Sequence, residues 1–564
     1  MIKGYLNFIL HSHIPWVLGY GRWPHGLDWL SEATTESYIP LLNQIVKLIN
    51  EGYSPHLNIG ITPILQEQLQ SSDFIVEFEY YLRNKIVASE NDIKEFSKGE
   101  KNGLLPIAEM WRNYYAKILE DFRTTYDGSI INSLRRLQNQ GYIEIITSAA
   151  THGYLPLLKY DRSVEAQINC GAKIYKHYFG QESHGIWLPE CAYRPSYKWT
   201  PPAGNDKTSY DRKGIDELLS KYNIEYFIID SHLLKGGKAI GVYLSRFKAL
   251  RDLWRHFKRE FVEIKEDFEK SPYENYLVSS NPHLRPLIIF TRDPVTALQV
   301  WSGELGYPGD SHYLDFHKKR FPGGLKYWRV TNPKIDLASK EIYDLEVVEN
   351  ILKGHARNFV SMVKNIAEKY YKTNHKPALI CTPFDTELFG HWWFEGPRWL
   401  YYVLKYVEED TEIALVTGTA AIKKIKSDKV VSLPEGSWGE GGFHYIWLNQ
   451  WTNWTWQKIY DAEDQFYALY DKYINSPSKM KIRILKQLGR ELLLLQSSDW
   501  QFLISTQNAR DYAEYRFNSH FENFKQLASF LEKGKVEKKD ISVLNNLEKK
   551  DSCFQNMDLS VFAP

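Results

Sequence analysis

The 564-residue chain has little cysteine, almost no net charge and no long apolar segment. Its four cysteines, Cys170, Cys191, Cys381 and Cys553, never stand in C-x-x-C spacing, so the sequence predicts neither a disulfide scaffold nor a structural zinc site. A net charge of +1 argues against a protein that binds nucleic acid without sequence specificity, because such proteins usually have an excess of basic residues. No run approaches about 18 uncharged apolar residues, and the apolar start of the chain has no cleavage site. We therefore expect a cytoplasmic protein with no membrane contact.

Aromatic side chains, in contrast, are abundant: 18 tryptophans, 38 tyrosines and 27 phenylalanines, against 5 methionines. A hydrophobic core does not need so many indoles, whereas a ligand with flat apolar faces and many hydroxyls would use them. Nine of the tryptophans lie between Trp392 and Trp500. We expect about half of these to form a seam between two domains, since buried indoles dominate such interfaces.

Short apolar runs alternate with helix-like segments over the first 430 residues. The runs are Tyr5–Leu10, His56–Ile61, Tyr142–Thr147, His184–Leu188, Tyr226–Asp230, Leu287–Phe290, Ala378–Cys381 and Ile413–Val416. This alternation predicts a parallel sheet with covering helices, and the number of runs favours a barrel. In such barrels the chemistry lies at the carboxyl ends of the strands.

Two insertions interrupt the predicted barrel of residues 1–430. The first, about 64–140, is long and helix-like, and the second, about 244–285, is basic and aromatic and then acidic. Residues 431–535 lose the strand signal and predict a C-terminal helical domain. Residues 536–564 form a charged tail that we expect to be poorly ordered.

Polar residues follow five of the predicted strands, beside proline, glycine or aromatic residues, which suggests one shared site. Two carboxylates stand out, Glu190 and Asp385, each just after a proline-containing strand exit. Such a pair, about 5–5.5 Å apart, provides the nucleophile and the acid–base of a retaining glycosidase. A single carboxylate in this position is more often a helix cap, but two in aromatic-rich exits of different strands favour catalysis.

Two histidines, His11 and His13, are two residues apart at the end of the first predicted strand, so their side chains lie on the same face. Hydrogen bonding to a sugar hydroxyl is our first interpretation. Zinc ligation completed by a carboxylate is the second, and a role in the core is the third.

Taken together, these motifs resemble a known family. HSHIPW, ATHGYLP, WLPECAY, TPFDTELFGHWWFEGP and SWGEGGFHYIWLN are similar, in this order, to the conserved regions of glycoside hydrolase family 57. FTRDPVTALQVWSGELGYPGD and QSSDWQF look like its glucan branching enzyme subgroup, and the resemblance covers roughly residues 1–525. It implies an α/β fold, an incomplete (β/α)7 barrel with helical insertions and a C-terminal all-α domain. It also implies a retaining mechanism without metal or cofactor.

The resemblance carries roles for individual residues. It implies that Glu190 is the nucleophile and Asp385 the general acid and then base, acting on an α-1,4-glucan such as amylose, amylopectin or glycogen. Transfer of the cleaved chain to a 6-hydroxyl would create an α-1,6 branch. His11, His13 and His152 would line the cleaved sugar's site. Further glucan contacts are expected at Trp29, Arg292, Trp301, Gly309, Trp438, Trp447 and Asp499.

One departure from the family pattern leaves alternatives open. After Tyr243, the candidate for a loop tyrosine, about fifty residues (244–291) intervene where the family's branching enzymes have a short loop. An α-amylase or a 4-α-glucanotransferase on the same scaffold therefore stays possible. Other classes are a metal-dependent carbohydrate deacylase using His11 and His13, and a non-catalytic glucan-binding protein.

Overall fold

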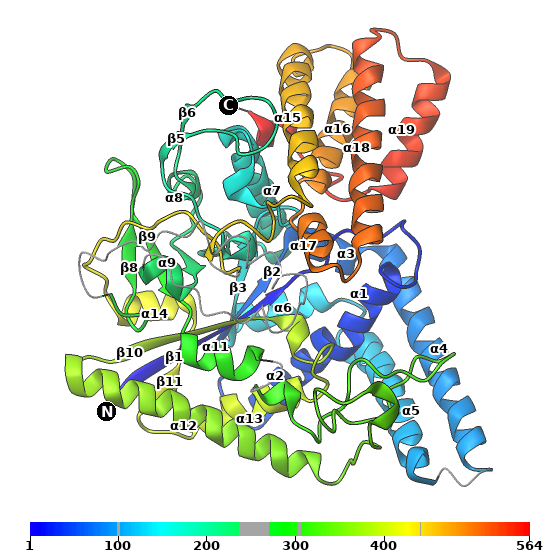
Figure 1. Ribbon diagram of the computed structural model, residues 1–564, viewed down its shortest axis with the longest axis vertical. Helices are drawn as coiled ribbons and strands as arrows, with labels where there is room; N and C mark the ends of the chain where they lie inside the picture. The colour runs from blue at the N-terminus through cyan, green and yellow to red at the C-terminus, as the bar shows by residue number, and fades with distance from the viewer. Residues whose placement is uncertain (99–101, 236–269, 303–305, 440–441, 564) are drawn as a thin grey trace.

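A single nine-stranded sheet lies at the centre of the molecule (Figure 1). The computed structural model describes residues 1–98, 102–235, 270–302, 306–439 and 442–563. In spatial order, the main path of the sheet is β10 (Ala378–Asp385), β1 (Gly4–Ser12), β2 (Leu57–Ile61), β3 (Ile143–Ser148), β4 (Gly185–Trp187), β7 (Tyr226–Ile229), β9 (Leu287–Thr291) and β8 (Tyr276–Val278). Neighbours from β10 to β9 pair in parallel, while β8 pairs antiparallel with β9. With β11 (Ile413–Leu415), which pairs with β1, all eight apolar runs predicted as strands are confirmed.

The sheet curls until its two sides touch. Just beyond β9, the backbone N–H of Asp293 donates to the carbonyl of Cys381 in β10 (2.8 Å), and Arg292 forms a parallel bridge with the same residue. Because the joined strands are parallel, their carboxyl ends gather at one rim. Residues that follow those ends can therefore share a site.

Helices cover the outside of the sheet because each has one apolar stripe. In α2 (Ile39–Asn50), for example, Ile39, Leu42, Ile45 and Leu48 are buried at helical spacing, as predicted. Within the described residues up to 430, the other α-helices are α1 (Leu27–Ala33), α3 (Pro63–Gln70), α4 (Ser72–Phe96), α5 (Leu105–Glu120), α6 (Ile130–Asn139), α7 (Asp161–Phe179), α8 (Ile215–Leu219), α9 (Ser231–Lys235), α11 (Pro294–Trp301), α12 (Val348–Asn374), α13 (Gly396–Glu408) and α14 (Gly418–Lys424).

The first insertion is helical, as its sequence suggests, and α4 and α5 extend together along one flank of the molecule (Figure 1). The second lies only partly within the described residues. Its described part, 270–285, contains β8, whereas residues 244–269 and Tyr243 lie outside them. Between β4 and α8, β5 (Tyr197–Trp199) and β6 (Tyr210–Arg212) pair antiparallel and form a small hairpin, whose loop is residues 200–209.

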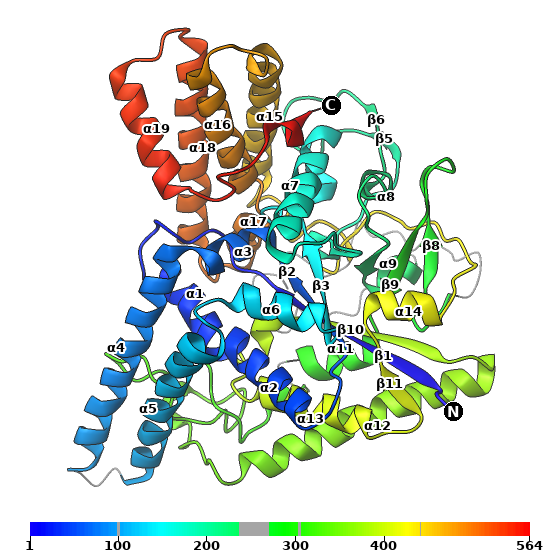
Figure 2. The ribbon, with the colours of Figure 1, turned by 180° about the vertical axis from the view of Figure 1, so that it is seen from behind.

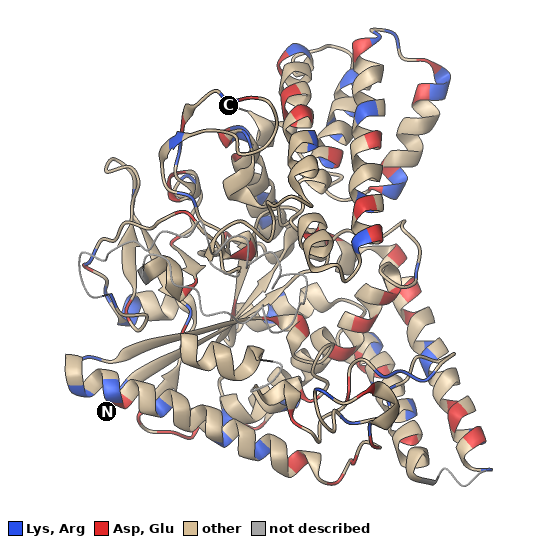
Figure 3. Ribbon diagram, in the orientation of Figure 1, with Lys and Arg blue, Asp and Glu red and all other residues tan. Residues whose placement is uncertain are grey.

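The C-terminal region is helical. Its helices are α15 (Asn453–Tyr473), α16 (Lys479–Leu495), α17 (Asp499–Thr506), α18 (Arg510–Glu532) and α19 (Lys538–Lys550). Four of them, α15, α16, α18 and α19, stand side by side, and α17 lies between them and the carboxyl rim of the sheet (Figures 1 and 2). Basic and acidic residues are interspersed along these helices and along α4 (Figure 3), in line with the near-zero net charge. No helix in the described ranges is both long and apolar enough to cross a membrane.

The expectation of a poorly ordered tail after residue 536 is wrong. That segment forms α19 and a short helical turn at Leu559–Phe562, which packs on α7. Phe554 and Phe562 are fully buried. Among its charged residues the tail has a few apolar side chains, and their burial against the neighbouring helices is enough to order the segment.

Candidate active site

The predicted catalytic and histidine residues meet at the carboxyl rim of the sheet. They line one cavity of about 1340 Å³. The lining includes nine of the expected residues: His11, His13, Trp29, His152, Glu190, Trp301, Asp385, Trp438 and Asp499. Side chains from β1, from the turn after β4 and from β10 are thus brought together with residues from beyond position 430.

Glu190 occupies a strained backbone position. It lies in the short turn Pro189–Cys191 after β4, with φ +60° and ψ 24°, a left-handed conformation that costs a non-glycine residue about 1–3 kcal/mol. The segment around Trp438 holds it there. The backbone N–H of Trp438 donates to the Glu190 carbonyl (3.0 Å), and Tyr193 forms a bridge with Gly436. This backbone pairing fixes the direction in which the Glu190 carboxylate points.

Both oxygens of the Glu190 carboxylate accept hydrogen bonds. The indole Nε1 of Trp438 donates to Oε2 (2.9 Å), and the hydroxyl of Ser498 donates to Oε1 (3.0 Å). Burial raises the pKa of Glu190 to about 7, and the nearby charges of Asp385 and Asp499 act in the same direction. The two hydrogen bonds partly oppose this rise, because they stabilise the ionised form.

A chain of hydrogen bonds leads from this carboxylate to two histidines. His152 Nδ1 lies 2.9 Å from the Ser498 hydroxyl oxygen, and His152 Nε2 lies 3.1 Å from His11 Nε2. Burial lowers the pKa of both histidines well below the ordinary value, so both are neutral. Since Ser498 donates to Glu190, it must accept from His152 Nδ1–H. His152 Nε2 then accepts from His11 Nε2–H, and every donor points toward Glu190.

His13 belongs to a second arm of the site. Its Nε2 lies 2.9 Å from Asp499 Oδ2 and its Nδ1 3.0 Å from the hydroxyl of Thr62. Burial disfavours the ionised form of Asp499, but the adjacent His13 outweighs it and holds the pKa of that carboxyl below its ordinary value. Asp499 is therefore a fixed anion at the start of α17.

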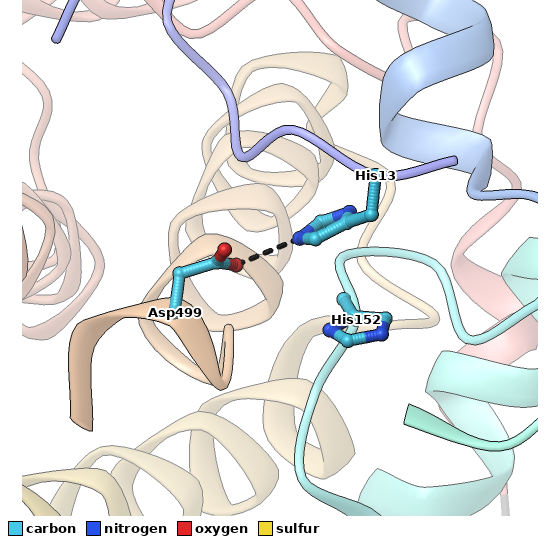
Figure 4. A group of neighbouring side chains, drawn as sticks. All are labelled: His13, His152 and Asp499. Atoms are coloured by element: carbon cyan, nitrogen blue, oxygen red, sulfur yellow. Dashed lines mark hydrogen bonds and ion pairs between the residues drawn. The ribbon is translucent and has the colours of Figure 1, made fainter. Parts of the chain in front are cut away.

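His13, His152 and Asp499 are also the group of the site whose spacing would suit a metal ion (Figure 4). Their candidate ligand atoms lie within 4.8 Å of one another. The two imidazoles, however, stack with centroids 4.1 Å apart and planes 21° from parallel. A ring nitrogen binds a metal in the plane of its ring, and the planes of stacked rings do not converge on one ion. The arrangement suits hydrogen bonding better than coordination.

Three of the expected glucan contacts, Arg292, Gly309 and Trp447, do not line the cavity. Arg292 forms a buried ion pair with Asp230 and lies over the ring of Trp438, 5.6 Å from its centroid. Trp447 is 1% exposed and stacks on Tyr154, with centroids 4.6 Å apart. Gly309 ends the short turn Tyr307–Gly309. Arg292 thus supports a wall residue, and Trp447 belongs to the seam between sheet and C-terminal helices.

The structure also brings in residues that the sequence did not single out. Ser498 contacts both Glu190 and His152, and Glu387 lines the cavity beside His13. Glu387 accepts hydrogen bonds from the backbone of His13 (3.0 Å) and from the hydroxyl of Tyr38, and burial raises its pKa to about 7. Both residues lie inside motifs that the sequence had flagged, one position before Asp499 and two after Asp385. Their place in these motifs and their hydrogen-bonding side chains were the only features of the sequence that could have identified them.

Comparison with known proteins gives consistent matches. The family model of glycosyl hydrolase family 57 matches residues 7–434, and that of the C-terminal domain of 1,4-alpha-glucan branching enzymes matches residues 458–562. The chain is 39% identical over 556 residues to a 1,4-alpha-glucan branching enzyme of Thermococcus kodakarensis, covering 98% of this chain and 78% of that protein.

Solved structures agree with these matches. The family 57 branching enzyme of Pyrococcus horikoshii is similar with a TM-score of 0.88 at 38% identity, covering 100% of this chain and 97% of that one. The α-amylase AmyC of Thermotoga maritima is similar with a TM-score of 0.82 at 29% identity, covering 100% and 99%.

Proposed function

Because the chain belongs to glycosyl hydrolase family 57, we propose that it is a 1,4-alpha-glucan branching enzyme. One observation carries the proposal. Glu190 and Asp385 line a common cleft, and Ser498, from the region that matches the branching enzyme C-terminal domain, donates to the carboxylate of Glu190.

The reaction begins with cleavage of an α-1,4 bond. Asp385, protonated, gives its proton to the leaving glycosidic oxygen while Glu190 attacks the anomeric carbon, so that a glucosyl ester forms and a free 4-hydroxyl departs. Asp385, now ionised, takes the proton of an acceptor 6-hydroxyl. That oxygen attacks the anomeric carbon, the ester bond breaks, and an α-1,6 link forms with retained configuration.

Two features of the site serve this sequence. Trp438 and Ser498 hold both oxygens of Glu190, which fixes the attacking group in place. Trp301 and Trp438 meet edge to face, with centroids 6.3 Å apart, in the wall of the cleft. Such indoles bind the flat face of a sugar and keep water from the ester, which favours transfer over hydrolysis.

The same proposal covers the architecture and the substrate. The curled parallel sheet, joined between β9 and β10, is interpreted as an incomplete (β/α)7 barrel of residues 1–430, and residues 431–535 as a helical domain that completes the cleft. The substrate is an α-1,4-glucan. Location in the cytoplasm stays a prediction.

Analysis of linkages in the products tests the function. Purified protein incubated with amylose is expected to generate new α-1,6 linkages, seen by NMR, and Glu190→Gln and Asp385→Asn are each expected to abolish them. Products consisting only of short linear maltooligosaccharides would favour an α-amylase instead. The likeness to the Thermotoga maritima amylase makes this the second candidate.

A further inference from the structure

The cleft continues well beyond the catalytic carboxylates. The cavity that contains Glu190 and Asp385 is also lined by α4, from Tyr80 to Glu95, and by the loop 316–324. From Tyr80 to Glu95, the fifteen steps of 1.5 Å along the helix span about 22 Å. A cleft with a wall of that length is longer than the chemistry at a single glycosidic bond requires.

The loop 316–324 is fixed firmly to α4. Lys85 Nζ donates to the carbonyl of Gly323 (2.9 Å). Arg320 pairs with Asp92 (3.1 Å) and with Glu95 (2.7 Å). At position 323 a Cβ atom would lie 2.8 Å from the Cβ of Ala88, so only glycine permits this close approach of loop and helix. The conformation of the loop is therefore set by its contacts with α4.

This fixed loop presents an aromatic side chain to solvent. Phe321 is 66% exposed although it lines the cavity. Fully burying such a side chain is worth about 1.5–3 kcal/mol, and the loop forgoes that gain. Tyr80 of α4, which lines the same cavity, is 47% exposed, and Arg22, paired with Glu77, lies 4.5 Å from its ring centroid. Exposed aromatic rings held in a cleft are typical of ligand sites.

Polar residues in the same cavity lining suit a neutral ligand with many hydroxyls. Asn84 and Asn91 of α4 line the cavity, and each amide can both donate and accept a hydrogen bond. Of the basic residues in this part of the lining, Arg22, Lys319 and Arg320 are paired with carboxylates. Lys85 donates to the carbonyl of Gly323. The surface therefore offers rings, amides and mostly paired charges, which suits a glucan chain better than a phosphorylated ligand.

We propose that Tyr80, Asn84 and Asn91 of α4 together with Phe321 form a distal subsite that binds glucose units of the glucan chain remote from the cleaved bond. The inference rests on the proposed function, because the occupant is the same α-glucan. We expect the distal subsite to favour long chains, since a chain must extend beyond the catalytic centre to contact Phe321.

Kinetics with substrates of two lengths test the proposal. In Phe321→Ala the ratio of kcat/KM on long amylose to kcat/KM on a short maltooligosaccharide is expected to fall about 3- to 10-fold, the effect of one lost aromatic contact. Phe321→Tyr, which keeps a ring, is expected to retain the ratio. Tyr515→Ala is the matched control, because Tyr515 is 60% exposed but lies outside the cavity lining. An unchanged ratio in Phe321→Ala overturns the distal subsite.

Binding to an inactive variant separates this inference from the proposed function. Affinities for the long and the short chain are measured by calorimetry on Glu190→Gln, with and without Phe321→Ala. A length-dependent affinity that disappears with Phe321→Ala supports the distal subsite even if the products contain no branches. Equal loss of affinity for both lengths, or none, rejects it. Thermal melting of each variant verifies that the loop substitution leaves the protein folded.

Discussion

At the scale of single residues, Glu190 combines two unfavourable properties: a left-handed backbone and a buried carboxyl group. The first is offset by backbone hydrogen bonds from the segment around Trp438, and the second only partly by two side-chain donors. Both serve to aim one oxygen at a sugar carbon. Stability and activity should therefore respond in opposite directions when this residue changes.

We expect Glu190→Gln to lose activity by about a thousandfold or more and to gain stability at high pH. The carboxyl has a pKa near 7 in the folded chain against 4.5 ordinarily, so the folded chain binds the proton more tightly. Ionisation of the buried carboxyl destabilises the folded chain. This destabilisation is absent below about pH 4.5, grows as the pH rises and reaches its full value of about 3 kcal/mol above about pH 7. Glutamine never ionises. Its melting temperature, relative to that of the parent protein, should be higher at about pH 8 than at about pH 5. An equal difference at both values would contradict this assignment.

Ser498 is expected to act as a positioning residue for Glu190. Its hydroxyl lowers the pKa of the carboxyl by donating to it, so Ser498→Ala should raise that pKa and shift the acid limb of the kcat/KM profile to higher pH. We expect kcat to fall about tenfold, the effect of one hydrogen bond to a charged group. Ser498→Thr keeps the hydroxyl and should restore the profile. A uniform loss at every pH in the alanine variant would indicate a merely structural role.

The strand exits drew attention to Glu190, Asp385 and the histidines, and the family resemblance implied their roles; the structure brings these side chains to one cavity. The sequence did not single out Ser498 or Glu387, whose roles depend on contacts between distant segments. It expected Trp447 in the cleft, whereas stacking on Tyr154 buries it in the seam. Periodicity identifies strand ends, but it does not distinguish an indole that faces a ligand from one that faces another helix.

At the scale of elements, Gly442, before α15, is a position where the fold is sensitive to substitution. Gly442 has φ +76°, and a Cβ atom there would lie 2.2 Å from the ring of His232. The carbonyl of Gly442 accepts from the backbone of Ser437, next to Trp438. Gly442 thereby helps to set the position of the indole that donates to the carboxylate of Glu190.

Gly442→Ala is expected to destabilise the fold by about 1 kcal/mol or more and to lower kcat/KM by displacing Trp438. Chemical denaturation and assays on amylose measure the two effects. Gly52→Ala is a useful control: it also has a positive φ, +89°, but a Cβ atom there meets nothing within 4 Å. If both variants lost the same activity, close packing at Gly442 would not be the cause.

Elements were predicted best where the apolar period is regular. All eight strands and the amphipathic α2 follow from their spacing. The sequence missed α19, because its apolar residues are few among lysines and glutamates. Their burial depends on a surface that α16 and α18 provide, which a single segment does not reveal.

At the scale of the whole molecule, a buried charged cluster joins the N-terminal segment to the C-terminal helices. Arg516 of α18 donates to the carbonyl of Trp16 (2.6 Å) and lies 3.4 Å over the ring of Tyr20. Tyr20 in turn donates to Asp551 (2.9 Å), and burial raises the pKa of Asp551 to about 7. The cluster lies beside the segment that carries Trp29 into the cleft.

Arg516→Ala is expected to destabilise the protein by about 3–5 kcal/mol, because it removes one member of a buried charged network and leaves the others without it. Activity should fall as well, since the 14–29 segment loses its attachment. Arg510→Ala, on the same helix, removes an exposed pair with Glu514 and should cost less than about 1 kcal/mol. Urea unfolding of both variants provides the comparison. Similar losses would show that the Arg516 contacts contribute little.

The hydrogen bonds that hold Glu190 have a consequence for synthesis of the protein. Both donors, Trp438 and Ser498, follow the two catalytic carboxylates in the chain. At ~5–20 residues per second, translation reaches Ser498 roughly 10 s after Asp385. During that interval a nascent chain carries both proposed catalytic residues, Glu190 and Asp385, without the two donors that hold the Glu190 carboxylate. We therefore expect a chain that ends before Ser498 to be inactive on glucan until the later helices are made and dock.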